Sequence, residues 1–141
     1  MKMKKLSFLF ILLGVVVATS CNAQSDSKNQ TKYTAEGKVE VYYFHFTGRC
    51  VTCKTVEAEA KTNVETIYAE QFKSGKISFQ AINLDDESSK AIAEKLGVTG
   101  QTLLIVGGTQ KINITNDGFM YARKNPDKFK QIMKEKIDKL L

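Results

Sequence analysis

The feature that most constrains this chain is an abrupt change of pattern just before residue 50. Lys38–Phe46 is rich in β-branched and aromatic residues and almost continuously apolar, which predicts a strand covered on both faces. Thr47-Gly48-Arg49 interrupts this run. From Cys50 onward, apolar residues recur every three or four positions, and this period predicts a long amphipathic helix that ends before Ser74-Gly75. A buried strand therefore leads directly into a helix.

The remaining pattern predicts three more strands, which are Ile77–Leu84, Thr102–Val106 and Lys111–Thr115. Asp85-Asp86-Glu87 is expected to start a helix that Gly97 ends, with its carboxylates at the positive end of the helix. Gly107-Gly108 predicts an antiparallel hairpin of the last two strands. Asn125-Pro126 is typical of the cap and first position of a C-terminal helix. The order β-α-β-α-β-β-α predicts an α/β fold with a central four-stranded mixed sheet and helices on both faces.

The first twenty residues are typical of a targeting segment. Three lysines (Lys2, Lys4 and Lys5) precede Leu6–Ala18, an apolar run of about 13 residues that is too short for a transmembrane helix of about 20. Small residues and then Cys21 follow, and this setting resembles the bacterial lipoprotein signal, in which the cysteine is lipidated. Ala18 stands where leucine is usual, and ordinary cleavage near Ala23 is the alternative. Two or three acyl chains on Cys21 would anchor the protein firmly.

Three parts of the chain are therefore expected. Residues 1–20 form the signal peptide, residues 21–35 form the lipidated N-terminus and a flexible polar tether, and residues 36–141 form the folded domain. Without the three leader lysines, 18 basic residues face 15 acidic ones, and they are spread along the chain. This distribution suits a location beside anionic lipid and predicts no nucleic-acid partner.

The chemistry is expected at the pair Cys50 and Cys53, since a bridge across so short a loop hardly constrains the unfolded chain. Cys50 would sit at a helix N-terminus, where unpaired amides and the helix dipole stabilise a thiolate and lower the pKa of the thiol. Cys53 lies one turn further on, faces the core and would resolve the mixed disulfide. Arg49 and, more weakly, Lys54 would add positive charge.

Other interpretations of the cysteine pair stay open. A structural zinc site needs four nitrogen or sulfur ligands, whereas this chain offers Cys50, Cys53 and a single histidine, His45. The pair could be a structural remnant without chemistry. It could also bind a soft ion such as Cu(I), or an arsenic or mercury species, because a vicinal dithiol suits such ions.

The chain resembles the thioredoxin family over about residues 36–141. The resemblance rests on the first strand, the Cys-x-x-Cys pair, the helix after it and the segment Gly97-Val98-Thr99-Gly100-Gln101-Thr102-Leu103-Leu104-Ile105. Arg49-Cys50-Val51-Thr52-Cys53-Lys54 resembles the family's Trp-Cys-Gly-Pro-Cys-Lys, and Asn83-Leu84-Asp85 resembles the end of its next strand. The resemblance implies a thioredoxin fold in which Cys50 attacks a disulfide and Cys53 resolves it. It implies no cofactor besides the redox-active Cys50–Cys53 pair.

Departures from the family pattern point to a specialised partner. Arg49 replaces the flanking tryptophan, and Val51-Thr52 replaces Gly-Pro, which should alter redox potential and partner choice. Thr102 stands where the family has a cis-proline, so a trans bond is expected there, with Thr102 able to contact the sulfurs. The same register puts Phe44 where many members keep a buried acid and Ala81 where they keep a lysine. The usual proton acceptor for Cys53 is thus missing.

His45 shares a face of the first strand with Val41 and Tyr43, so it is expected either to line the core or to lie close enough to Cys50 to tune it. The expected function is that of a membrane-anchored thiol–disulfide oxidoreductase acting on envelope proteins, more a reductase than an oxidase. A reductase would take electrons from a membrane thiol transporter, whereas an oxidase would need a quinone-linked partner. The expected location is the bacterial cell envelope, lipid-anchored and facing the periplasm, with the inner membrane favoured over the outer.

Overall fold

The computed structural model of the chain describes residues 37–141. The expected signal peptide (1–20), the tether (21–35) and the lipidation site Cys21 lie outside the described residues. Within 37–141, no helix is both long and apolar enough to cross a membrane.

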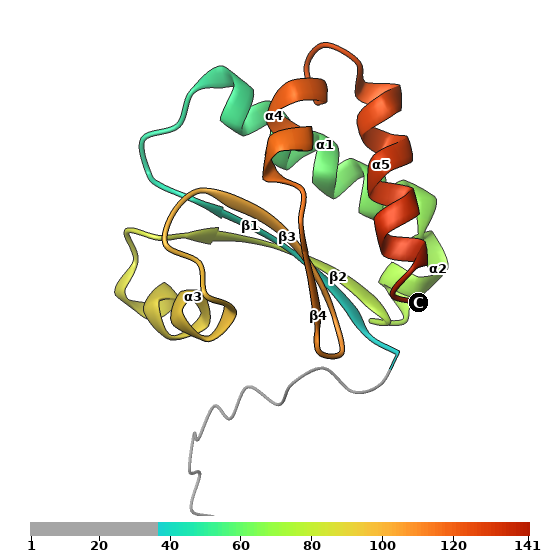
Figure 1. Cartoon of the computed structure of the whole chain (residues 1–141), viewed down its shortest axis with the longest axis horizontal. Helices are drawn as coiled ribbons and strands as arrows, with labels where there is room; N and C mark the ends of the chain where they lie inside the picture. Colours follow the sequence, from blue (N-terminus) through green and yellow to red (C-terminus); the bar gives the residue numbers. More distant parts are fainter. Residues whose placement is uncertain (1–36) are drawn as a thin grey trace, which may run out of the picture. The chain divides into compact units, whose positions relative to one another are not determined.

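A four-stranded mixed sheet forms the centre of the fold, as the sequence predicts (Figure 1). Its strands are β1 (Val39–His45), β2 (Ile77–Asn83), β3 (Thr102–Gly107) and β4 (Gln110–Asn113). The spatial order is β2-β1-β3-β4. Strand β2 runs parallel to β1, whereas β3 is antiparallel to both β1 and β4. The parallel first pair and the antiparallel hairpin are both confirmed.

Helices cover both faces of this sheet, which confirms a second expectation. They are α1 (Val51–Ile67), α2 (Ala69–Lys73), the short 3₁₀ helix η1 (Glu87–Ser89), α3 (Lys90–Leu96), α4 (Thr115–Tyr121) and α5 (Pro126–Asp138). Figure 1 shows α1, α4 and α5 over one face and α3 over the other. Asn125 caps α5 as expected, because its side-chain oxygen accepts from the backbone N–H of Lys128 at 3.1 Å.

Alternation along β1 divides the apolar side chains between these two layers. Val41 and Tyr43 belong to the cluster under α1, α4 and α5, whereas Tyr42 and Phe44 belong to the cluster under α3. Both faces of the strand are buried, which is why its sequence is apolar without a clear period of two.

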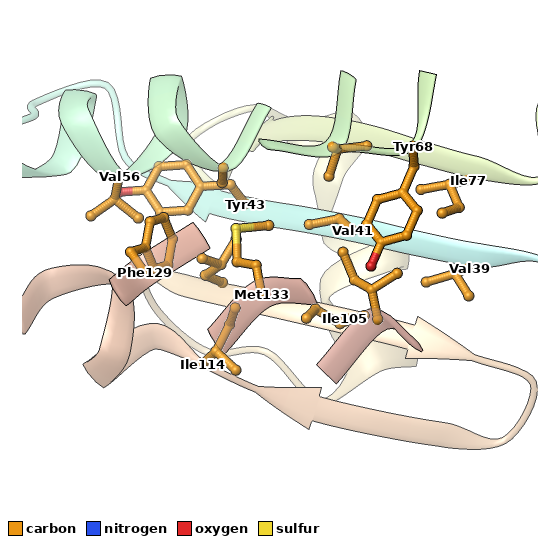
Figure 2. Packing of buried hydrophobic residues seen from close by; sticks show 14 of the residues in the cluster. Val39, Val41, Tyr43, Val56, Tyr68, Ile77, Ile105, Ile114, Phe129 and Met133 are labelled. Atoms are coloured by element: carbon orange, nitrogen blue, oxygen red, sulfur yellow. The ribbon is translucent and has the colours of Figure 1, made fainter. Parts of the chain in front are cut away.

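The larger of the two clusters packs the sheet against α1 and α5. Figure 2 shows Tyr43 beside Val56 of α1 and Phe129 of α5, with Met133 next to them. None of these four side chains keeps any exposed surface. Burial of a large apolar side chain contributes about 1.5–3 kcal/mol, so this cluster holds the start of α1 firmly on β1.

The helical segment ends before Ser74 as predicted, but it is not continuous, because Tyr68 divides it into α1 and α2. Tyr68 leaves the helical conformation at φ −118° and ψ 38°. Its ring is buried in the cluster under α5, and its hydroxyl donates to Asp138 Oδ1 at 2.6 Å. Tertiary contacts of one side chain thus override the continuous helical period.

The helix expected from Asp85-Asp86-Glu87 begins later than predicted, as η1 at Glu87 followed by α3 at Lys90. Asp85 lies in the preceding turn, where its carboxylate accepts from the backbone N–H of Thr47 at 2.7 Å. Gly97 ends the helix as expected, in the left-handed conformation with φ 72°.

Helix α4 was not predicted, and the fourth strand ends at Asn113 rather than at Thr115. The segment begins with the turn-forming residues Thr115-Asn116-Asp117-Gly118, which carry little helical signal. Gly118 allows the close packing, because a Cβ at this position would lie 3.0 Å from Val56 Cγ1. Packing against α1 therefore accounts for a helix that local preference does not favour.

We expect Met133→Ala to destabilise the fold by about 2–5 kcal/mol, since it removes a fully buried side chain. It also leaves the buried Asn63 amide without the Met133 sulfur, which lies 3.7 Å from Asn63 Nδ2. Met120→Ala is the matched control, because Met120 is 54% exposed; its effect should stay within about 0.5 kcal/mol. Urea unfolding followed by circular dichroism measures both. Equal losses in the two variants would contradict this packing.

Candidate functional site

The two cysteines occupy different environments at the start of α1. Cys50 is the N-cap residue, extended at φ −76° and ψ 168°, and its side chain is exposed. Cys53 lies one turn into the helix and is only 6% exposed. Their Cα atoms are 5.2 Å apart and their sulfurs are joined in a disulfide. The sulfur of Cys50 is thus open to a partner, whereas that of Cys53 is covered.

The helix start also supplies a hydrogen bond to the exposed sulfur. The backbone N–H of Cys53 donates to Cys50 Sγ at 3.3 Å, so this sulfur takes the place that a serine or aspartate oxygen fills in an ordinary cap. A hydrogen bond to the charged form favours that form, and the helix dipole acts in the same direction. Once the pair is reduced, the geometry favours a thiolate at Cys50.

A short chain of polar groups surrounds Cys53. The hydroxyl of Tyr43 on β1 donates to the Cys53 carbonyl oxygen at 2.9 Å and accepts from Nε2 of Gln101. This arrangement turns Gln101 Oε1 toward Cys53 Sγ, 3.7 Å away. In the disulfide this sulfur has no hydrogen, but in the dithiol it can donate to Oε1. The contact would then keep Cys53 protonated while Cys50 ionises.

Gln101 is the residue that sequence reasoning missed, although it lies in the segment that carried the resemblance. The expected contact was Thr102, whose hydroxyl instead donates to the Gly100 carbonyl oxygen at 2.9 Å. No peptide bond in residues 37–141 is cis, as expected for Thr102. A polar side chain directly before a buried strand was the available signal, but its direction depends on how β3 enters the sheet.

The side chain of β1 that reaches Cys53 is Tyr43, not Phe44. Phe44 packs in the cluster under α3, on the other face of the sheet, and Ala81 pairs with Tyr43 across β1 and β2. Burial raises the pKa of the Tyr43 hydroxyl, so this group stays protonated near neutral pH. Within the described part of the chain, the side-chain hydrogen-bond partner of Cys53 Sγ is Gln101 Oε1.

Arg49 is close to the pair, but its charge is compensated. Its guanidinium forms an ion pair with Glu57 of α1, and both side chains are about three-quarters buried. The side chain of Lys54 points into solvent. Of the residues between the cysteines, Val51 is 68% exposed and Thr52 lines a surface pocket. The motif thus presents an apolar and a hydroxyl side chain to a partner.

The loop that leads into Cys50 is tied to the end of β2. The Thr47 backbone N–H holds the pKa of the exposed Asp85 carboxyl below its ordinary value, and Asn83 Nδ2 donates to Thr47 Oγ1 at 3.0 Å. His45 is buried, as expected, on the same side of β1 as Tyr43. The centroids of the His45 and Tyr43 rings are 6.0 Å apart. Its Nδ1 lies 3.0 Å from the Phe46 carbonyl oxygen. Among residues 37–141 no hydrogen bond joins its ring to Cys50.

In the part of the chain that the structure describes, no three His, Cys, Asp or Glu residues gather as metal ligands. The reduced pair itself would offer two sulfurs to a soft ion.

No protein-family model matches this chain, and no curated protein sequence matches it. A solved structure titled "Structure of a malarial protein" is similar to it at 20% sequence identity, with a TM-score of 0.39. That match covers 52% of this chain and 74% of the other.

In the reduced protein we expect the pKa of the Cys50 thiol to lie below that of a free cysteine, because the Cys53 N–H and the helix dipole stabilise the thiolate. Alkylation by iodoacetamide as a function of pH, followed by peptide mass analysis, measures each cysteine separately. Alkylation of Cys50 should persist at pH values at which Cys53 is unreactive. Titration of Cys50 like a free thiol would contradict a stabilised thiolate at the helix start.

We expect Gln101→Leu to make the reduction potential about 10–20 mV more negative. The variant removes the acceptor of the Cys53 thiol, a hydrogen bond of about 0.5–1 kcal/mol that stabilises the dithiol only, and 1.4 kcal/mol corresponds to about 30 mV. Equilibration with glutathione buffers measures the potential. Gln110→Leu, on the exposed strand β4, is the control and should leave it unchanged. An equal shift of the reduction potential in both variants would show that Gln101 does not act on the cysteine pair.

Proposed function

We propose that this chain is a membrane-anchored thiol–disulfide oxidoreductase of thioredoxin fold. The observation that carries the proposal is the asymmetry of the pair, in which Cys50 is exposed as the helix N-cap and Cys53 is buried beside Gln101. The element order and the four-stranded mixed sheet with helices on both faces are compatible with that fold. Thiol–disulfide exchange needs this asymmetry, because one sulfur attacks the substrate and the other stays protonated until it resolves the mixed disulfide.

In the reducing direction, the Cys50 thiolate attacks one sulfur of a substrate disulfide. The substrate S–S bond breaks, its second sulfur leaves as a thiolate, and a mixed disulfide forms with Cys50. Cys53 then loses its proton to solvent and attacks Cys50 Sγ, which releases the first substrate sulfur. The substrate gains two electrons, and the Cys50–Cys53 pair becomes a disulfide.

The oxidised pair needs two electrons to act again. A membrane thiol–electron transporter is the class of donor that suits a lipid-anchored protein, and a lipid on Cys21 would hold the domain beside it on the periplasmic side of the membrane. This arrangement favours a reductase over an oxidase. Envelope proteins with disulfides are the substrates of this reaction.

We expect Cys53 to resolve the mixed disulfide on Cys50 slowly, which fits an enzyme with a specialised partner. Gln101 lies at the Cys53 sulfur and the Tyr43 hydroxyl lies at the Cys53 carbonyl oxygen, and neither group is a base near neutral pH. A mixed disulfide on Cys50 therefore persists until water removes the Cys53 proton. A partner held in the correct orientation for that time is favoured over one that dissociates quickly.

We expect Cys53→Ser to accumulate mixed disulfides on Cys50, because the attacking sulfur remains and the resolving sulfur is gone. Cell-envelope extracts separated on non-reducing gels, with mass spectrometry of the captured bands, provide the measurement. Cys50→Ser is the matched control and should capture far less, since Cys53 is buried.

An absence of adducts on Cys53→Ser would count against exchange. If the wild-type dithiol then bound Cu(I) or arsenite tightly at one ion per pair, the protein would instead be a dithiol module that binds soft ions. Inertness in both assays would leave a structural role.

A further inference from the structure

A pocket of about 240 Å³ opens at the first turn of α1. Thr52, which lies between the two cysteines, lines one side of it, and Phe119 of α4 lines another. Arg123 and Lys124, which follow α4, complete the wall. Since Thr52 is the residue before Cys53, an occupant of this pocket would lie close to the reacting sulfurs.

The wall of the pocket carries two cationic side chains. Arg123 and Lys124 are both exposed, and neither forms an ion pair with a residue in 37–141. Arg49 differs in this respect, because Glu57 compensates its charge. The two unpaired cations in the pocket wall therefore attract an anionic group.

Apolar surface adjoins these charges. Phe119 forms part of the pocket wall, and the next residue, Met120, is 54% exposed. Val51, which directly precedes Thr52 in the chain, is 68% exposed. Exposed apolar side chains next to a reactive sulfur offer contact area to a polypeptide that extends beyond a single charged group.

We propose that this pocket binds an acidic side chain of the disulfide-bearing substrate, so that the preferred substrate is a polypeptide with aspartate or glutamate near the attacked cysteine. This inference rests on the proposed exchange function and adds a substrate class to it. The Arg123 guanidinium presents paired donors that match a carboxylate, Lys124 adds a second cation, and the Thr52 hydroxyl is a further donor. The ion pair holds the substrate sulfur at Cys50, where the exchange described above takes place.

The test uses three cystine peptides that differ in one residue next to the cystine, which is aspartate, asparagine or lysine. Single-turnover rate constants are measured with the reduced full chain at low ionic strength. We expect the aspartate peptide to react about three- to tenfold faster than the lysine peptide, as a few exposed charges provide. Added salt should reduce the difference.

Two double variants separate the pocket from net charge. Arg123→Glu with Lys124→Glu should reverse the order of the peptides. Lys73→Glu with Lys76→Glu makes the same change in net charge before β2, at the opposite end of the parallel strands from Cys50, and should retain the wild-type order. Arg123→Gln with Lys124→Gln should abolish the preference, and it serves as the test if the charge-reversed protein does not fold.

The outcomes distinguish the two proposals. Exchange with none of the peptides would overturn the proposed function and this inference together. Exchange at equal rates for all three peptides, or an order that Arg123 and Lys124 do not affect, would overturn the inference alone. Oxidised glutathione serves as a small acidic disulfide. If its rate constant fell on charge reversal while those of the peptides did not, the occupant would be a small molecule and the polypeptide assignment would be wrong.

Discussion

The hydrogen bond from the buried Tyr43 hydroxyl to the Cys53 carbonyl oxygen ties the central strand to the first turn of α1. Tyr43 pairs with Ala81 of β2 and Leu103 of β3, so its backbone is held between two neighbouring strands. The same hydroxyl accepts from Gln101, which brings the segment before β3 to the resolving sulfur. One buried group thus sets the position of the helix start relative to the sheet, and both sulfurs depend on that position.

The two-layer core makes this constraint effective. Because both faces of β1 are buried, the strand cannot slip by one residue without moving Tyr43 and Phe44 into the wrong layers. Val56 and Phe129 enclose the Tyr43 side of the strand, and neither is exposed. The helix start is therefore held on a rigid base, although Cys50 itself lies at the surface.

Charge around the site is distributed unevenly. Arg49 directly precedes the attacking cysteine, yet its ion pair with Glu57 removes much of its influence on a partner. Arg123 and Lys124 are far from the motif in sequence and bring unpaired positive charge to the pocket beside Thr52. The local sequence thus points to Arg49 and, more weakly, to Lys54, whereas the folded chain adds Arg123 and Lys124.

The sequence by itself determined the elements whose signals are local: the strand that leads into Cys50, the cap at Asn125, the hairpin glycines and the order of an exposed and a buried cysteine. These follow from backbone preference and from the period of apolar residues, which act within one or two turns. Only the tertiary structure decided the break at Tyr68, the helix α4, the placement of Gln101 at Cys53 and that of Arg123 in the pocket at Thr52. Those features depend on contacts between residues distant in the chain, and side-chain direction at such contacts is set by packing rather than by local preference.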